Sequence, residues 1–445
     1  MQTDTDTHWF TKLTQIKPSE FRSAIVSFFF VFILMGAWMI LRPVRDSLPS
    51  DWGDVSLAVQ WTYTFLASLV AVSIYNFLAA KISLKKMVPG TFVFFAMSFF
   101  VLYFMSKFVD GDWLGKTFYI WSSVFSLFHV SVFWSFTAQA YTKAQSKRTF
   151  AFINTGASVG AILGSLSMKY LLKDTPLEAI LLLACAALIA VLPLIYLLNK
   201  EQAKSSHSDK NSHPILSSNP FKGFSELFAS KKLLGIAGFI FLFTALGTIF
   251  YIAQSEALAE YSRPDRKALL SSLDIWQNLA TILLGLFAAN RISSKFGLAT
   301  SLSLVPFIVS ILLLFLSMNP IVMFVLALQL VRKTGNYAIT KPAREILFTG
   351  VSKEARFKTK PIIDVAVYRG GDVFWVWAFA LLGDGHYHFT LSQKLWVGAG
   401  IAVLWGILGI YLGKSHTKLE KEEGGDTPDG DGHNQLLRAE KKPQT

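Results

Sequence analysis

Residues 331–372 read VRKTGNYAITKPAREILFTGVSKEARFKTKPIIDVAVYRGGD, a segment that sets charged side chains among long apolar runs. The charged residues near or inside those runs are Arg332, Lys333, Lys341, Arg344, Glu345, Asp364, Arg369 and Asp372. A charge at the centre of a bilayer costs about 2.5–3.5 kcal/mol on insertion scales. Such charges need a partner, a ligand or a water-filled cavity, so the segment indicates a solute pathway through a membrane protein.

The composition of the whole chain supports this class. Of 445 residues, 52% are hydrophobic and 16% are charged, against about 25% charged in soluble domains. The net charge of +13 would suit nucleic acid, but the basic residues lie mostly in short loops between apolar runs. That distribution sets membrane topology. We therefore expect an integral membrane protein that contacts membrane lipids and binds no nucleic acid.

Twelve apolar runs each approach the roughly 20 residues that a membrane-spanning helix needs. The predicted spans are 23–41, 57–80, 87–106, 117–140, 150–171, 177–198, 233–254, 269–290, 298–318, 321–340, 361–382 and 393–413. With the N-terminus inside, the inner segments carry 29 lysines and arginines and the outer loops carry 9. This asymmetry predicts a multi-pass protein of the inner (plasma) membrane with both termini in the cytoplasm.

The longest connection between spans begins NKEQAKSSHSDKNSHP, a polar composition that indicates a flexible linker. The predicted divisions are an N-terminal cytoplasmic segment (1–22), a six-helix bundle (23–198), a cytoplasmic linker (199–232), a second six-helix bundle (233–413) and a disordered cytoplasmic tail (414–445). We therefore predict an all-α membrane protein with twelve transmembrane helices, and a substrate site between its two bundles.

Two arginines end the first predicted span, in the segment LRPVRDS. Arg42 and Arg45 are three residues apart and would share a helical face, unless Pro43 breaks the helix. One interpretation has both side chains reaching toward lipid headgroups. The other places at least one in a central cavity, where it attracts an anion, and the sequence leaves both open.

Polar residues also interrupt the seventh and eighth spans. Gln254 lies at the end of the seventh, and Asp274, Gln277 and Asn278 follow at positions i, i+3 and i+4 of the eighth, on one helical face. A hydrogen-bond network between helices would explain them. They would equally suit a cavity lining, in which Asp274 holds a proton or a cation.

The eleventh span carries Asp364, Tyr368 and Asp372 at intervals of four residues, which places them in one stripe. Arg369 is three residues before Asp372, so these two side chains can pair. A salt bridge alone would account for that pair but not for Asp364. We therefore predict that the stripe faces the pathway.

The loop before this span is basic, and binding to anionic headgroups is its simplest explanation. Arg344 and Glu345 directly follow Pro342, which indicates a fixed, paired element. Together with Lys341 they form a predicted inner gate, because alternating access needs elements that lock and release.

In the fifth span Gly156, Gly160 and Gly164 indicate a close helix contact, or alternatively a face on which helices slide. The sequence shows no GxxxxGK[ST] phosphate loop and no nucleophile–base pairing. His386 and His388 are too few to indicate a metal site. We therefore expect neither an enzyme nor a bound cofactor or metal.

Three segments resemble the ATP/ADP antiporter family of bacteria and plastids, which is similar to the major facilitator fold. They are NYAITKPAREILFTGVSKEARFKTKPIIDVAVYRGGD (336–372), VFWSFTAQAYTKAQSKRTFAFINTGASVGAILGS (132–165) and WMILRPVRDSL (38–48). In nucleotide-exchanging members a lysine stands at the position of Arg45, and an acidic residue at that of Gln139. Arg369 matches a family arginine, whereas Asp372 stands where plastid carriers have a lysine.

The resemblance implies a secondary transporter of an organic anion, with ATP/ADP exchange as its specific form. Separately, we expect the protein to be monomeric. Arg45, Arg369 and Arg42 would hold the anionic groups, while Asp364 and Asp372 would pair with these cations or carry a proton. Two alternatives stand beside it. One is proton-coupled transport of a solute that is not a nucleotide, suggested by Asp372, and the other is a membrane sensor or partner protein that transports nothing.

Overall fold

The structure is a computed structural model that describes residues 16–79, 81–108, 112–204, 222–287, 289–318, 320–349, 351, 359–360 and 362–425. Throughout these ranges the regular structure is helical. Its elements are α2 (Pro18–Ser47), η1 (Pro49–Asp51), α3 (Asp54–Ala79), α4 (Leu84–Met105), α5 (Asp112–Ala140), α6 (Lys143–Ser167), η2 (Met168–Leu172), α7 (Leu177–Ala190), α8 (Leu192–Lys204), α9 (Lys222–Ala229), α10 (Lys231–Leu258), α11 (Arg263–Phe287), α12 (Ala289–Met318), α13 (Val322–Gly335), η3 (Asn336–Thr340), α14 (Lys341–Leu347), η4 (Ile362–Val367), α16 (Tyr368–Ala380), η5 (Leu381–Gly385) and α17 (Leu391–Gly425).

The prediction of membrane-spanning helices is confirmed. Ten helical segments of the described chain are long and apolar enough to cross a bilayer. The predicted eighth and tenth spans are helical too, as α11 and as the continuous run α13–η3–α14. These two are the more polar ones, because α11 carries Asp274 and α13 carries Arg332 and Lys333. All twelve predicted spans therefore correspond to helices.

Helical structure extends past the predicted boundaries in three places. The predicted linker 199–232 includes the end of α8 and all of α9, although residues 205–221 lie outside the described chain. The predicted tail from residue 414 is helical as far as Gly425, because α17 continues. The connection predicted between the eighth and ninth spans is also helical, and its kink falls at Gly297, which has a φ of 76°. The predictions for 1–15 and 426–445 fall outside the described residues.

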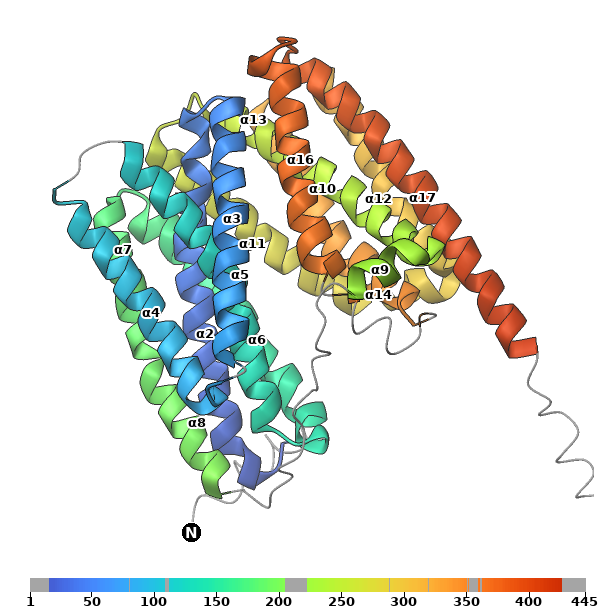
Figure 1. Cartoon of the computed structure of the whole chain (residues 1–445). Helices are drawn as coiled ribbons and strands as arrows, with labels where there is room; N and C mark the ends of the chain where they lie inside the picture. Colours follow the sequence, from blue (N-terminus) through green and yellow to red (C-terminus); the bar gives the residue numbers. More distant parts are fainter. Residues whose placement is uncertain are drawn as a thin grey trace, which may run out of the picture.

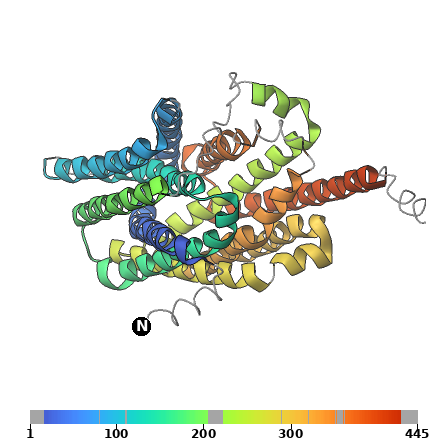
Figure 2. The ribbon, with the colours of Figure 1, turned by 90° about the horizontal axis from the view of Figure 1, so that it is seen from below.

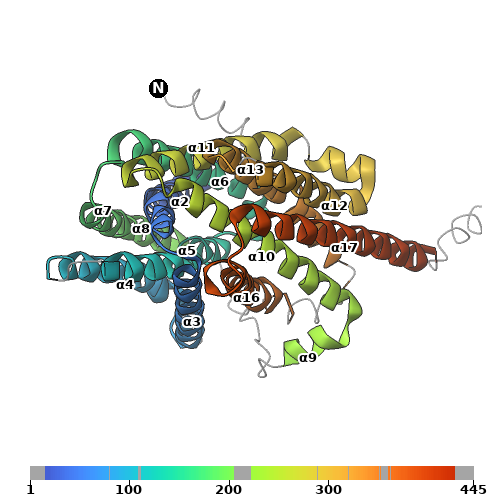
Figure 3. The same ribbon diagram turned by 90° about the horizontal axis from the view of Figure 1, so that it is seen from above.

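Two large hydrophobic cores follow the two halves of the chain. One consists of buried residues between Val26 and Leu198, and the other mostly of residues between Leu227 and Leu412. The helices of the two halves gather on opposite sides of the molecule (Figure 2). The helix α11 lies at the junction, where it packs on both α2 and α6 (Figure 3). The space between the halves is thus bordered by α2, α3, α5, α10, α11 and α16.

The two halves meet at one end of the molecule and diverge toward the other (Figure 1). We call the first the closed end; it holds the connections after α2 and before α17. At the closed end Lys394 Nζ of the second half donates to Asp54 Oδ2 of the first at 2.8 Å, and Arg266 Nη1 donates to Asp51 Oδ1 at 2.6 Å. The start of α2 and the end of α17 both lie at the diverging end.

The glycine series of α6 packs against α2 within the first half. A Cβ at Gly160 would lie 2.2 Å from the carbonyl oxygen of Phe32, and one at Gly164 would lie 2.4 Å from that of Gly36. Only hydrogen fits at such a separation between helix backbones. Because both helices belong to the same half, the series serves close packing inside a bundle.

Adding one methyl group here should destabilise the protein. We expect Gly160→Ala to lower the free energy of unfolding by about 1–3 kcal/mol, because the helices must separate to accommodate the Cβ. Thermal unfolding in detergent measures the effect. Gly90→Ala in α4 is the matched control, since a Cβ there meets nothing within 4 Å. Equal melting temperatures for both variants would contradict the packing.

Candidate functional site

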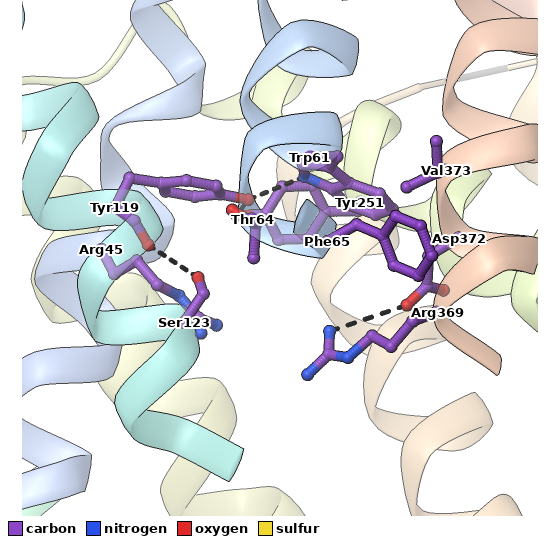
Figure 4. Close-up of a pocket in the computed structure, with 10 residues that line it drawn as sticks. All are labelled: Arg45, Trp61, Thr64, Phe65, Tyr119, Ser123, Tyr251, Arg369, Asp372 and Val373. Carbon is purple, nitrogen blue, oxygen red and sulfur yellow. Dashed lines mark hydrogen bonds and ion pairs between the residues drawn. The ribbon is translucent and has the colours of Figure 1, made fainter. Parts of the chain in front are cut away.

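A cavity of about 110 Å³ lies between the two halves. The first half supplies residues from α2, α3 and α5, and the second half supplies residues from α10 and α16. Figure 4 shows its lining, which consists of Arg45, Trp61, Thr64, Phe65, Tyr119, Ser123, Tyr251, Arg369, Asp372 and Val373. Two arginines, one from each half, therefore border one cavity whose remaining walls are largely aromatic.

Arg45 reaches this cavity because α2 continues through Pro43 without a break as far as Ser47. Its Nη2 atom is 2.7 Å from Asp46 Oδ1, and its guanidinium carbon lies 5.1 Å from the ring centroid of Trp38. The side chain is only 15% exposed. The carboxylate and the ring hold the guanidinium in one orientation. A guanidinium can donate two parallel hydrogen bonds to an oxyanion, so Arg45 is suited to bind one.

Asp46 also receives a chain of hydrogen bonds that crosses between the halves. Trp61 Nε1 donates to Tyr119 Oη at 2.8 Å, Tyr119 Oη donates to Tyr251 Oη at 3.1 Å, and Tyr251 Oη donates to Asp46 Oδ1 at 3.2 Å. Tyr251 belongs to α10 and the other three to the first half. A ligand that displaced one of these hydroxyls would therefore break hydrogen bonds between the two halves.

On the opposite wall of the cavity, Arg369 and Asp372 belong to α16 (Figure 4). Arg369 Nη1 is 3.8 Å from Asp372 Oδ2, and the two side chains are 28% and 17% exposed. The predicted pairing is therefore present, but it is long. Tyr368 does not line the cavity with them; its ring packs on Phe243, with centroids 6.1 Å apart.

Arg42 and the polar face of α11 form a second contact between the halves. Arg42 Nη1 is 3.2 Å from Asp274 Oδ1, and Arg42 Nε is 3.5 Å from Asp46 Oδ2. Asn278 Nδ2 instead donates to the carbonyl of Asp274 in its own helix, at 2.9 Å. Gln277 is buried, and its Oε1 atom has no partner among the described residues.

The remaining predicted polar residues lie elsewhere. Gln254 is buried within the second half, where its Oε1 atom accepts from Gln329 Nε2 at 3.0 Å. Gln139 is exposed in the last turn of α5 and does not line the cavity.

Asp364, predicted to face the pathway, does not line the cavity and instead contacts the predicted inner gate. Its Oδ1 atom is 3.5 Å from Arg344 Nη2, which is also 3.5 Å from Glu345 Oε1. Lys360 pairs with Glu345 as well. Burial alone would raise the pKa of Glu345, but the hydrogen bond from Lys360 and the charges of Lys360 and Arg344 hold that pKa below its usual range. Lys341 is exposed, with its Nζ 5.6 Å from the Tyr337 ring centroid.

Comparison with known families now decides the class. A family model described as Major Facilitator Superfamily matches residues 27–343, more than half of the chain. The chain belongs to the Major Facilitator Superfamily. It is therefore a multi-pass membrane protein of a transporter family. No curated protein sequence matches significantly.

Solved structures of major facilitators share the fold. The nucleoside transporter NupG has a TM-score of 0.62 at 14% identity, over 89% of this chain and 99% of that one. A bacterial homologue of the human lysosomal transporter Spinster has a TM-score of 0.58 at 12% identity, over 90% and 98%. The xylose transporter XylE from E. coli has a TM-score of 0.59 at 10% identity, over 87% and 94%. Identities this low show the fold alone.

Sequence reasoning missed the ion pairs that join the two halves of this major facilitator at the closed end. Lys394 Nζ contacts both Asp54 Oδ2 at 2.8 Å and Glu256 Oε1 at 2.6 Å, while Asp384 Oδ2 accepts from the backbone nitrogen of Asp54 at 3.0 Å. These residues come from four separate helix ends, so no spacing along the chain links them. The pairing of Asp46 with Arg42 could have been predicted, because Asp46 is four residues after Arg42 in LRPVRDS.

Proposed function

We propose that the protein is a secondary active transporter that moves an organic anion by alternating access. The observation that carries this proposal is the pair Arg45 and Arg369, which border one cavity from opposite halves. Each is paired with a carboxylate of its own half, Asp46 or Asp372. An anion bound between them would hold the halves together through charge-assisted hydrogen bonds.

The shape of the molecule supports alternating access about this cavity. The halves are joined by ion pairs at the closed end and diverge at the other (Figure 1). We propose that the diverging end faces the cytoplasm and that the protein lies in the inner membrane, because the excess of lysine and arginine falls on that side of the predicted spans. The similar structures of the Spinster homologue and of XylE are described as inward-facing and inward open.

Within the class of organic anions, we propose a nucleotide such as ATP or ADP as the solute. The resemblance to ATP/ADP antiporters motivates this choice, and the cavity places Arg45 and Arg369, whose guanidinium groups suit phosphate, beside the rings of Trp61, Phe65 and Tyr119. Stacking of a base on an aromatic ring contributes about 1–3 kcal/mol. Uptake of labelled ATP or ADP into cells that express the protein tests the proposal. Absence of uptake and exchange, with the protein verified in the membrane, would overturn the nucleotide version.

A second candidate is proton-coupled transport of a different solute, and Asp372 is the residue that favours it. This carboxylate faces the cavity next to Arg369, where plastid nucleotide carriers have a lysine. A carboxylate in a membrane pathway is a common carrier of a coupling proton.

Asp372→Asn distinguishes the two candidates. If the solute is an anion that competes with Asp372 for Arg369, we expect the variant to bind it about three- to tenfold more tightly, because an internal counter-charge of about 1 kcal/mol is removed. If Asp372 carries the coupling proton, the variant should instead lose accumulation driven by a pH gradient. Uptake into proteoliposomes with and without a pH gradient measures both. Unchanged affinity and unchanged proton dependence would exclude a role for Asp372 in either.

A further inference from the structure

A band of charged side chains crosses the interface between the halves and extends beyond the cavity. We define the charge band by its eight members, which come from α2, α11, α13 and α16 and are Arg42, Arg45, Asp46, Asp274, Arg332, Lys333, Arg369 and Asp372. Five of these are cations and three are carboxylates. The band therefore carries an excess of positive charge inside a membrane-spanning region, where uncompensated charge is unfavourable.

The three carboxylates are already shared among the cations. Asp46 accepts from Arg45 and also faces Arg42, while Asp274 pairs with Arg42. Asp372 interacts with the charge of Arg369 and with that of Arg332. None of the three carboxylates is therefore available to pair only with the cations of α13.

Arg332 is the most deeply buried cation of the band, at 7% exposure. Its Nη2 atom donates to Gln329 Oε1 at 2.8 Å, and its guanidinium carbon lies 5.4 Å from the ring centroid of Phe250. Its Nε atom is buried without a hydrogen-bond partner in the described chain. Within those residues Arg332 makes no ion pair: its direct contacts are a neutral amide and aromatic rings, and the charge of Asp372 acts on it only from beyond ion-pair distance.

Lys333 follows directly and points about 100° further around α13. It likewise makes no ion pair in the described parts of the chain, and the opposite charges that act on it are those of Asp274 and Asp46. Arg332 thus faces α10, and α13 also packs on α11. The π-helical turn η3 (Asn336–Thr340) follows them, and such turns often occur where a membrane helix carries function.

We infer that Arg332 and Lys333 form a second cationic subsite, distinct from Arg45 and Arg369, that binds a second anionic group of the transported solute. The inference rests on the proposed anionic solute and adds to it. A solute with two anionic groups, such as a diphosphate, would neutralise the excess charge of the band. A solute with one anionic group would leave Arg332 uncompensated.

Binding of inorganic phosphate and of pyrophosphate to the purified, full-length protein tests this subsite. We expect the wild-type protein to bind pyrophosphate at least tenfold more tightly than phosphate. Arg332→Gln and Lys333→Gln should remove that preference while changing phosphate affinity less than about threefold. Arg45→Gln should weaken both ligands alike. Isothermal titration calorimetry at constant ionic strength gives all of these affinities.

Two results separate failure of the subsite from failure of the proposed function. If the wild-type protein binds neither probe, a phosphate-bearing solute is overturned, and the subsite with it. If both probes bind but Arg332→Gln and Lys333→Gln weaken them equally or not at all, the anionic solute stands and the subsite is overturned.

The melting temperature of the ligand-free protein provides a second readout. A buried cation that pairs only with a bound ligand destabilises the ligand-free protein. Arg332→Gln should therefore leave the melting temperature unchanged or raise it. Arg266→Gln is the matched control, because Arg266 is as deeply buried but is paired with Asp51 at 2.6 Å, and its loss should lower the melting temperature. A comparable decrease for Arg332→Gln would show a structural cation and overturn the inference.

Discussion

Replacing Arg45 by glutamine should reduce transport of the anionic solute by about ten- to a hundredfold. Glutamine keeps a polar side chain in the cavity but removes the charge that attracts the anion. Loss of a hydrogen bond to a charged group costs about 1.5–3 kcal/mol, and each 1.4 kcal/mol corresponds to about tenfold in affinity. The fold should persist, since Asp46 keeps Arg42 at 3.5 Å and the hydroxyl of Tyr251 at 3.2 Å.

Counterflow into proteoliposomes loaded with unlabelled ADP measures this change. Arg22→Gln is the control, because the Arg22 side chain is 62% exposed and pairs only with Glu201 in the described chain, remote from the cavity lining. We expect Arg22→Gln to transport at the wild-type rate. Counterflow by Arg45→Gln within twofold of the wild-type rate would show that Arg45 does not bind the solute.

Replacing Lys394 by methionine should allow the two halves to separate at the closed end. The Lys394 side chain is 4% exposed and lies between Asp54 of the first half and Glu256 of the second. Without it two carboxylates face one another, with Asp384 close by. Breaking a buried ion pair by removing one partner costs about 3–5 kcal/mol. A change of that size shifts the balance between closed and open conformations by about two to four orders of magnitude.

Labelling of a cysteine introduced at Thr64, a buried residue of the cavity lining, reports this opening. The native Cys185 is replaced by serine in the background, and a membrane-impermeant maleimide is added on the side of the closed end. We expect Lys394→Met to increase the labelling rate at least tenfold and Lys394→Arg to restore the slow rate. Lys116→Met is the control, because Lys116 pairs with Asp112 within α5 alone. Equal labelling in all variants would show that these ion pairs do not hold the closed end.

The helices could be predicted from the sequence because the bilayer imposes one simple requirement. Some 20 consecutive apolar residues satisfy it, and that signal is local. The ends of helices in polar segments could not be predicted in this way. The continuation of α17 to Gly425 carries no apolar signal, and the eight residues of α9 in the predicted linker are too few to give the signal of a membrane span.

The candidate site was predictable only where its residues lie close together in the sequence. Arg42 with Arg45, and Arg369 with Asp372, are spaced for one helical face, and the structure places Arg45, Arg369 and Asp372 at the cavity. Contacts between distant segments gave no such signal. Examples are the hydrogen bond from Tyr251 to Asp46 and the ion pair of Lys394 with Asp54.

Thermal stabilisation of the purified protein by ADP, compared with adenosine, tests most directly whether an anion binds between the halves. The two ligands share base and ribose and differ in charge. A ligand present at 100 times its Kd stabilises the folded state by about 2.7 kcal/mol, which is readily measured. We predict that ADP raises the melting temperature, that adenosine has little effect, and that the shift with ADP is lost in Arg45→Gln combined with Arg369→Gln. Equal stabilisation by adenosine, or an undiminished shift in the double variant, would contradict the account.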